Sequence, residues 1–161
     1  MSAGWETQLT PEAARKLLSG DTPLREAMGV PLSELMFMAS RAYDLWRQGR
    51  RQDAETLYRG IVALDAGVSW GHAGLGLAAM EQGELEAAES HLRRAVAADP
   101  ADPSIQVNLA ECLIRRDQLV DALAILKPVV ENPEHASHPG AVRAAAILTG
   151  IGRGLSVLLP S

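Results

Sequence analysis

Residues 42–58 read AYDLWRQGRRQDAETLY, and two later stretches of this 161-residue chain follow the same pattern. They are GLAAMEQGELEAAESHL at 76–92 and AECLIRRDQLVDALAIL at 110–126, so the pattern recurs every 34 residues. The positions in register are Ala42/Gly76/Ala110, Gly49/Gly83/Asp117, Ala54/Ala88/Ala122 and Tyr58/Leu92/Leu126. Repetition at a fixed period predicts a stack of copies of one supersecondary unit.

A period of 34 residues is typical of tetratricopeptide repeats, in which each copy is a helix-turn-helix pair. One pair buries only part of its apolar surface, so neighbouring pairs must stack into a curved array whose concave side can hold a peptide. The sequence therefore predicts an all-α fold: a tetratricopeptide-type helical array of three helix-turn-helix repeats. An N-terminal helical arm precedes the array, and a C-terminal capping helix follows it.

Glycine, proline and aspartate residues mark the boundaries of these parts. In the arm, one helix starts after Thr10 and stops at Gly20, and a shorter one ends at Gly29. Residues 132–139 read as a loop, from which Pro139 opens the capping helix. The predicted domains are the arm at 1–31, the repeats at 32–136 (copies at about 35–68, 69–102 and 103–136) and the cap at 137–161.

Within each pair, small residues on one helix are expected to meet large residues on the other. In the first repeat, the facing positions are Met38, Ala42 and Leu45 on the first helix and Ala54, Tyr58 and Ile61 on the second. Gly76 and Ala110 repeat the small residue of Ala42, which predicts a close approach of the two backbones at this level.

The first helix of each repeat carries a second apolar face, at steps of three and four residues. Its positions are Met36, Ala39, Tyr43 and Trp46, then Trp70, Ala73, Leu77 and Met80, then Val107, Glu111 and Ile114, where Glu111 and the neighbouring Arg115 dilute the apolar character. In a tetratricopeptide array these positions line the concave surface, so we predict that they form a peptide-binding groove. The alternative is core packing, the commoner role of such stripes. Two observations favour the groove: other positions fill the packing face, and Tyr43, Trp46 and Trp70 are half of the chain's six aromatic residues.

The N-terminal arm is also apolar. Its large side chains are Leu9, Leu17, Leu18, Leu24 and Met28. The arm either covers the groove or pairs with the arm of a second subunit, and both arrangements would hide apolar surface until a client binds.

Composition excludes several kinds of partner. The net charge of -5 argues against nucleic acid, because phosphate binding needs a basic face. The N-terminus lacks the features of a secretory signal, and no apolar run of about 18 residues is present to span a bilayer, so a cytoplasmic protein without stable membrane insertion is expected. Cys112 is the only cysteine, so no intrachain disulfide can form.

Little in the sequence points to an enzyme, and we predict no catalytic, cofactor-binding or metal-binding residue. His135 and His138 lack Cys or carboxylate partners at zinc spacing, and Cys112 lies on a face expected to be buried. The glycines at 150, 152 and 154 follow no strand, so they are expected to loosen or bend the last helix rather than bind a phosphate. The apolar side chains near the C-terminus, Leu155, Val157, Leu158 and Leu159, favour packing on the third repeat over membrane contact.

Local motifs within the period are similar to those of the class II chaperones of bacterial type III secretion, the SycD/LcrH/IpgC family. The matching segments are 42–49 (AYDLWRQG), Leu64-Asp65, Gly74-Leu75-Gly76, Gln82-Gly83, Asp102-Pro103 and Ala110-Glu111-Cys112-Leu113. They cover about residues 32 to 126. The chain departs from the family at Arg51, Leu85 and Leu92, where aromatic residues are frequent.

The resemblance implies a small cytoplasmic chaperone that keeps hydrophobic translocator proteins soluble and export-competent. Such a chaperone holds an extended segment of its client in the concave groove and frequently forms a homodimer through its N-terminal helices. Trp46 would correspond to a groove-lining aromatic residue of the family, beside Tyr43. The alternative function is that of a tetratricopeptide scaffold or adaptor in another bacterial assembly. A carboxylate clamp for a peptide terminus is not expected, because the inner positions are mostly apolar.

Overall fold

The computed structural model describes residues 10–20 and 22–158, with only the backbone described for residue 13 and residues 154–158. These residues form helices joined by turns and contain no strand, which confirms the all-α prediction. The chain divides into two compact units, residues 1–74 and residues 75–161, and the boundary lies inside helix α5 (Ser69–Gln82). Leu9 of the predicted arm lies outside the described residues, as does Leu159 at the other end.

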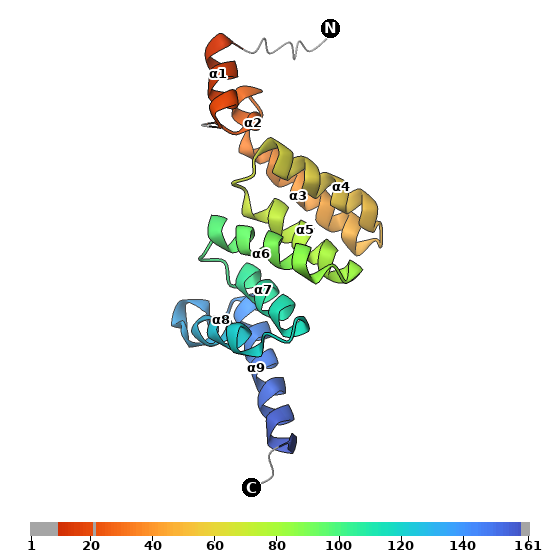
Figure 1. The fold of residues 1–161 in the computed structure, drawn as a ribbon, viewed down its shortest axis with the longest axis vertical. Coiled ribbons are helices and arrows are strands. Elements are labelled where there is room, and N and C mark those ends of the chain that lie inside the picture. Colours follow the sequence, from red (N-terminus) through yellow and green to blue (C-terminus); the bar gives the residue numbers. More distant parts are fainter. Residues whose placement is uncertain (1–9, 21, 159–161) are drawn as a thin grey trace. The chain divides into compact units, whose positions relative to one another are not determined.

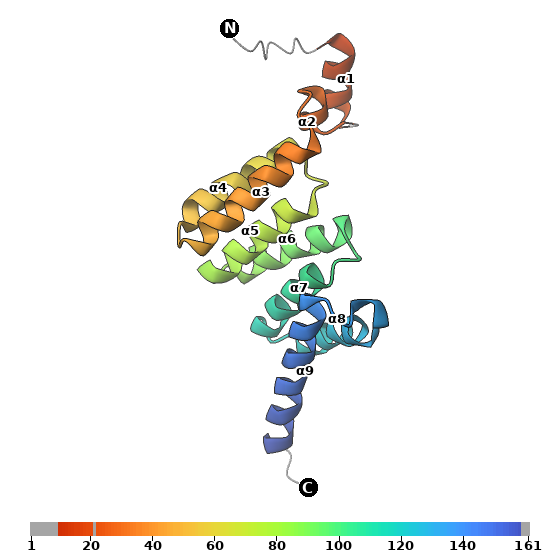
Figure 2. The ribbon, with the colours of Figure 1, turned by 180° about the vertical axis from the view of Figure 1, so that it is seen from behind.

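Unit 1 contains the N-terminal arm and the first repeat. The arm consists of α1 (Pro11–Ser19) and α2 (Leu24–Ala27), and Gly20 and Gly29 adopt positive φ values of 76° and 67° after them. The first repeat pairs α3 (Leu32–Arg47) with α4 (Arg51–Leu64), which lie side by side in Figures 1 and 2. Both arm helices and the helix pair were predicted by the sequence.

Unit 2 contains the remaining helices. They are α6 (Leu85–Ala98), α7 (Pro103–Arg115), α8 (Leu119–Glu131), the 3₁₀ helix η1 (Pro133–His135) and α9 (Pro139–Leu158). Helix α9 begins at Pro139 as predicted and packs against α7 and α8 (Figure 1). The loop expected at 132–139 is wrong in part, because Asn132 caps η1: its side-chain oxygen accepts from the Glu134 amide at 3.0 Å.

The turn inside each repeat has the same geometry. Gly49, Gly83 and Asp117 all take a left-handed conformation, with φ of 80°, 79° and 60°. In each case the next amide bonds back to the helix, as in Arg50 N to Leu45 O at 2.9 Å, which is the Schellman arrangement that satisfies the last carbonyls. The register Gly49/Gly83/Asp117 thus marks the positions where the backbone must turn, and aspartate tolerates this conformation better than most residues.

The core of unit 1 follows the small-against-large pattern expected from the sequence. Its buried residues include Leu35, Ala42, Leu45, Ala54, Tyr58 and Ile61 from α3 and α4. The start of α5 packs on α4 through glycine: a Cβ on Gly74 would lie 2.4 Å from the Tyr58 ring. Only glycine therefore leaves room for the aromatic ring at this position.

The core of unit 2 is a continuous cluster of buried side chains from α5 to α9. Its largest fully buried members are Leu92, Leu113, Leu126, Val107, Val129 and Cys112. A Cβ on Gly76 would lie 2.6 Å from Leu92 Cγ, whereas the nearest backbone atom, Ala88 O, is 3.4 Å away. The approach is close as predicted, but the crowding atoms belong mainly to the Leu92 side chain. The two glycines of the Gly74-Leu75-Gly76 motif are thus explained by two close contacts, of Gly74 with the Tyr58 ring and of Gly76 with the Leu92 side chain.

Candidate peptide-binding surface

Helix α3 exposes large apolar side chains outside the face that packs on α4. Met36 is 56% exposed, Phe37 68% and Tyr43 57%, because the helix packs on α4 through Leu35, Ala42 and Leu45 instead. Several exposed apolar side chains on one helix mark an interaction site more often than a single exposed residue does. We call Met36, Phe37 and Tyr43 the α3 surface.

Phe37 is the member of the α3 surface that the sequence pattern missed. It lies one residue after Met36 and therefore falls off the stripe of three- and four-residue steps that runs from Met36 to Trp46. The signal that could have found it is its position outside the packing face of α3, together with its being the only phenylalanine of the chain.

Arginine side chains lie against the aromatic residues at the end of α3. The Arg51 guanidinium is 4.2 Å from the centroid of the half-buried Trp46 ring, and Arg51 also donates to the Trp46 carbonyl oxygen. One turn earlier, the Arg47 guanidinium is 6.0 Å from the Tyr43 ring centroid. The Arg51–Trp46 distance is well within the range of cation–π attraction, and the Arg47–Tyr43 distance lies at its limit.

The other predicted groove residues of unit 1 are half-buried. They are Ala39 on α3 and Trp70 and Ala73 on α5. Their neighbours Gly71 and Gly74 are buried against α4, which orients this part of α5. The Tyr58 ring of α4 lies against Gly74. Burial raises the pKa of the Tyr58 phenol and the nearby Tyr43 raises it further, so Tyr58 stays neutral in the physiological range.

In unit 2, two of the predicted groove residues belong to the core. Met80 is 5% exposed and Val107 is fully buried, so neither is accessible to a peptide in this structure. Leu77 and Ile114 are half-buried and pack against the same cluster. Met80 and Val107 thus pack in the core, whereas a groove role for Leu77 and Ile114 stays a prediction.

Helix α9 is the physical reason for the burial on α7. Its Ala141 and Ala144 are buried in the cluster that contains Val107, and a Cβ on Gly140 would lie 2.7 Å from backbone atoms of Pro103 and Ser104. Arg143 of α9 pairs with the predicted groove residue Glu111 at 3.0 Å and donates to the Asn108 side chain. The capping helix therefore occupies the face of α7 that the sequence assigned to the groove.

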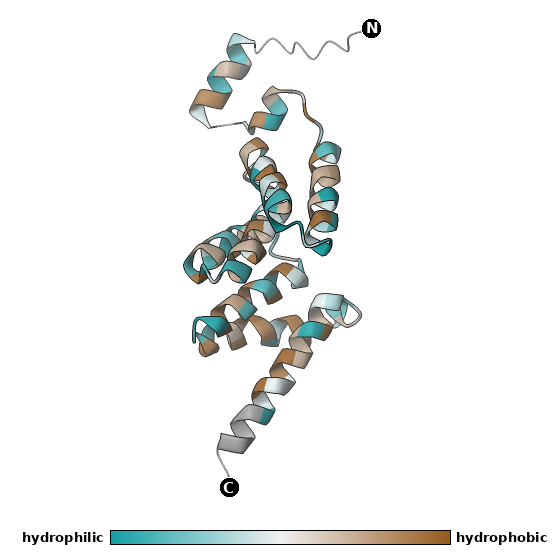
Figure 3. Ribbon diagram, turned by 90° about the vertical axis from the view of Figure 1, so that its right-hand side faces the viewer, coloured by the Kyte–Doolittle hydropathy of each residue, from teal (hydrophilic) through white to brown (hydrophobic). Residues whose placement is uncertain are grey.

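The far part of α9 makes fewer contacts. Nothing lies within 4 Å of a Cβ placed on Gly150 or on Gly152, and both residues are exposed. Hydrophobic residues predominate in the part of α9 that is coloured in Figure 3, and the helix continues through these glycines; that they loosen or bend it stays a prediction. The side chains of Leu155, Val157 and Leu158 lie outside the described residues, so their predicted packing stays a prediction.

An ion pair joins the N-terminal arm to the first repeat. Arg25 Nε of α2 donates to Asp65 Oδ2 at 2.7 Å, and Asp65, at the C-terminal end of α4, is 8% exposed. The other oxygen of Asp65 accepts from the Gly67 amide at 2.8 Å. The apolar arm side chains Leu18, Leu24 and Met28 remain exposed, whereas Leu17 is half-buried. Whether the arm covers a groove or pairs with a second subunit stays a prediction.

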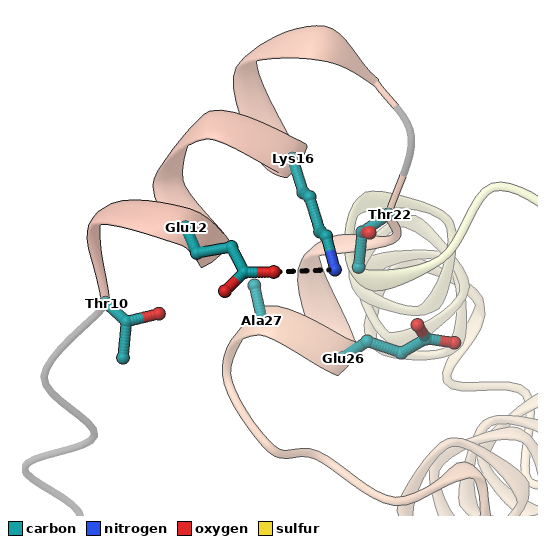
Figure 4. Close-up of a pocket in the computed structure, with 6 residues that line it drawn as sticks. All are labelled: Thr10, Glu12, Lys16, Thr22, Glu26 and Ala27. Atoms are coloured by element: carbon teal, nitrogen blue, oxygen red, sulfur yellow. Dashed lines mark ion pairs between the residues drawn. The ribbon is translucent and has the colours of Figure 1, made fainter.

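A depression of about 290 Å³ lies between α1 and α2 (Figure 4). Its lining residues are Thr10, Glu12, Lys16, Thr22, Glu26 and Ala27, and Lys16 pairs with Glu12 along α1 at 3.2 Å. Because this lining is polar and its one lysine is paired within α1, the depression does not extend the apolar α3 surface.

The side chains considered for chemistry have structural roles. Cys112 is buried, burial raises the pKa of its thiol, and its Sγ donates to the Leu85 carbonyl oxygen at 3.5 Å. His135 contacts the Asn132 side chain at 3.2 Å within η1. Among the residues that the structure describes, no three His, Cys, Asp or Glu side chains are grouped to hold a metal ion. Across the same residues, no helix is both long and apolar enough to cross a membrane.

Two family models described as tetratricopeptide repeat match the sequence, at residues 40–103 and 79–146. A comparison with curated proteins gives no match. Among solved structures, a type III secretion complex from Aeromonas hydrophila is similar with a TM-score of 0.73 and 19% identity, covering 90% of this chain and 98% of that chain. The translocator chaperone SycD of Yersinia enterocolitica is similar with a TM-score of 0.68 and 20% identity, covering 80% and 98%.

A third similar structure is PcrH, a protein of Pseudomonas aeruginosa, in complex with the chaperone-binding region of PopD. Its TM-score is 0.65 at 21% identity, with 78% of this chain and 96% of that chain covered. These similarities establish a shared fold, so the resemblance to translocator chaperones that the motifs predicted is confirmed at the level of the fold. The two tetratricopeptide-repeat models together span residues 40–146, and the helix pairs turn at Gly49, Gly83 and Asp117, so the fold is a tetratricopeptide-type helical array.

Proposed function

We propose that this chain is a cytoplasmic chaperone of a bacterial type III secretion system, which binds an extended segment of hydrophobic translocator proteins and keeps them soluble. The observation that carries the proposal is the apolar α3 surface on a fold shared with translocator chaperones. Two proteins of that fold have been solved with such segments: SycD with a peptide of the translocator YopD, and PcrH with the chaperone-binding regions of PopB and PopD.

The α3 surface has the chemistry that such a client needs. Burying a large apolar side chain contributes roughly 1.5 to 3 kcal/mol, from which the ordering of an extended peptide must be subtracted. Met36, Phe37 and Tyr43 offer three such contacts, and the half-buried Ala39, Trp46, Trp70 and Ala73 extend the surface within unit 1. A hydrophobic segment that would otherwise aggregate thus gains a specific place to bury its anchors.

We also propose that the chain forms a homodimer through its N-terminal arm. Leu18 is 90% exposed, and Leu24 and Met28 are exposed as well, so the arm has apolar surface left to pair. SycD has been solved in an alternative dimer, which supports dimerisation in proteins of this fold. Deletion of residues 1–30 followed by measurement of mass in solution tests the arm: an unaltered monomer mass before and after deletion would exclude arm-mediated dimers.

Co-expression with a translocator of the same secretion system tests the function. The expected result is a soluble complex, which Tyr43→Ala and Met36→Ala weaken while the helical circular dichroism spectrum stays unchanged. Val120→Ala is the matched control, because Val120 is 80% exposed on α8 and lies outside the proposed surface. A translocator that remains insoluble with the wild-type chain would contradict the chaperone proposal and favour a scaffold that binds a folded partner. A complex that tolerates both α3 substitutions would contradict the assignment of the surface.

A further inference from the structure

We propose that the end of α3 and the α3–α4 turn form a carboxylate-binding subsite. In this subsite Arg47, beside Tyr43, binds an Asp or Glu side chain of the client next to an apolar anchor residue. The inference rests on the proposed function and names the chemistry of the segment that fits. The subsite consists of Tyr43, Trp46, Arg47 and Arg51, all of which lie in unit 1.

The position of Arg47 differs from that of two other exposed arginines of the repeats. Arg59 on α4 pairs with Glu55 at 2.5 Å, and Arg93 on α6 pairs with Glu89 at 2.7 Å, each with an acid four residues earlier. Four residues before Arg47 stands Tyr43, so its guanidinium meets an aromatic ring in place of a carboxylate. Among the described residues Arg47 makes no ion pair, so its charge is left for a partner outside the chain.

The local charge also departs from that of the chain. Residues 47–53 (RQGRRQD) contain three arginines and one aspartate, although the chain as a whole has a net charge of -5. Asp53 pairs with Arg50 at 2.7 Å and Arg51 contacts Trp46, so the charge available to a client in this stretch is that of Arg47. Charge complementarity therefore favours an acidic side chain in the client over a basic one at this end of the α3 surface.

The geometry sets the spacing between anchor and acid. Tyr43 and Arg47 are one helical turn apart, and such neighbours lie about 5 to 6 Å apart at Cβ. An extended peptide advances about 3.3 Å per residue and returns to the same side every second residue. An apolar side chain on Tyr43 therefore places the side chain two residues away beside Arg47, where aspartate or glutamate can accept charge-assisted hydrogen bonds.

Arg51 adds a fixed wall to this subsite. Its guanidinium lies 4.2 Å from the Trp46 ring centroid and is bonded to the Trp46 carbonyl oxygen, so the indole is covered on one face. The ring and the guanidinium are thus ordered before a client binds, which lowers the ordering cost of binding. A pre-ordered wall beside Arg47 favours one peptide register over neighbouring ones.

The test uses overlapping peptides from translocators of the same secretion system, with binding measured by fluorescence anisotropy on the full chain. The best binder is expected to carry Asp or Glu two residues from an apolar anchor. Changing that acid to Asn or Gln weakens binding to the wild-type chain about two- to fivefold, as expected for one exposed charge-assisted contact. The same peptide change has little further effect on Arg47→Gln, and the wild-type difference shrinks in high salt.

Arg94→Gln is the control variant, because Arg94 is an exposed arginine on α6. The subsite is overturned if Arg47→Gln binds as tightly as the wild type, or if the peptide and protein changes are additive. Either result would leave the chaperone proposal standing as long as the wild-type chain binds some translocator peptide. If no translocator peptide binds the wild-type chain, the proposed function itself fails, and the subsite falls with it.

Discussion

Helices α3 and α7 are the first helices of their repeats, yet one leaves its second apolar face bare and the other has that face covered. On α3, Met36 and Tyr43 are more than half exposed, whereas on α7 Val107 is fully buried. Glu111 of α7 is paired with Arg143 of α9, whereas among the described residues of unit 1 the side chains of the α3 surface stay more than half exposed. The same sequence pattern therefore yields a candidate binding surface in one repeat and core in another, and the element that decides is the capping helix.

The largest expected effect comes from breaking the contact between α9 and α7. A Cβ at Gly140 would lie 2.7 Å from the Pro103 carbonyl carbon and the Ser104 amide nitrogen, and backbone atoms move less readily than side-chain tips. Gly140→Ala is expected to lower the free energy of unfolding by about 3 kcal/mol, at the upper end of overpacking costs. Hydrogen exchange on α7 should accelerate as α9 separates. An unchanged denaturation midpoint would mean that α9 can shift without loss, and the explanation for the burial of α7 would then fail.

A second substitution pair compares the two helices directly. Val107→Ala removes two buried methyl groups and is expected to cost roughly 2 kcal/mol of unfolding free energy, including the cavity term. Met36→Ala removes an exposed side chain and is expected to stay within about 0.5 kcal/mol of the wild type. Urea denaturation of both variants measures the difference. Equal costs at the two positions would show that α3 is covered in solution, by the arm or by a second subunit.

The N-terminal arm is joined to its repeat by the Arg25–Asp65 ion pair, whereas the capping helix α9 is held by close packing at Gly140. Arg25→Ala leaves the Asp65 carboxylate, 8% exposed, with only the Gly67 amide as a bonding partner, so a loss of roughly 1.5 kcal/mol is expected. Limited proteolysis should cut the arm faster in this variant. Lys16→Ala is the control, because the Lys16–Glu12 pair is exposed on both sides and its loss should change neither readout. Proteolysis of the arm at the wild-type rate in Arg25→Ala would show that the ion pair does not anchor α2.

The repeat and its turns could be predicted from the sequence because they depend on local chemistry. Left-handed turn positions require Gly49, Gly83 and an Asp at 117, and small-against-large packing follows from the 34-residue period. The fate of the second apolar face depends on an element far away in the chain. No pattern around Val107 reveals that Gly140 will let α9 approach Pro103, so the sequence could not separate Val107 from Tyr43. Phe37 was missed for the related reason that exposure, unlike periodicity, is a property of the folded chain.

The smallest expected effect has the opposite sign and separates the two halves of α9. Nothing lies within 4 Å of a Cβ on Gly150, so Gly150→Ala meets no neighbour and gains helix propensity, which is worth about 0.5 to 1 kcal/mol in favour of the folded state. The same substitution at Gly140 is expected to destabilise, although both glycines belong to one helix. Thermal denaturation of the two variants side by side distinguishes these outcomes by sign. If Gly150→Ala destabilised the chain as well, the far half of α9 would be packed against a surface in solution, and a second copy of the chain would be the first partner to test by measuring mass.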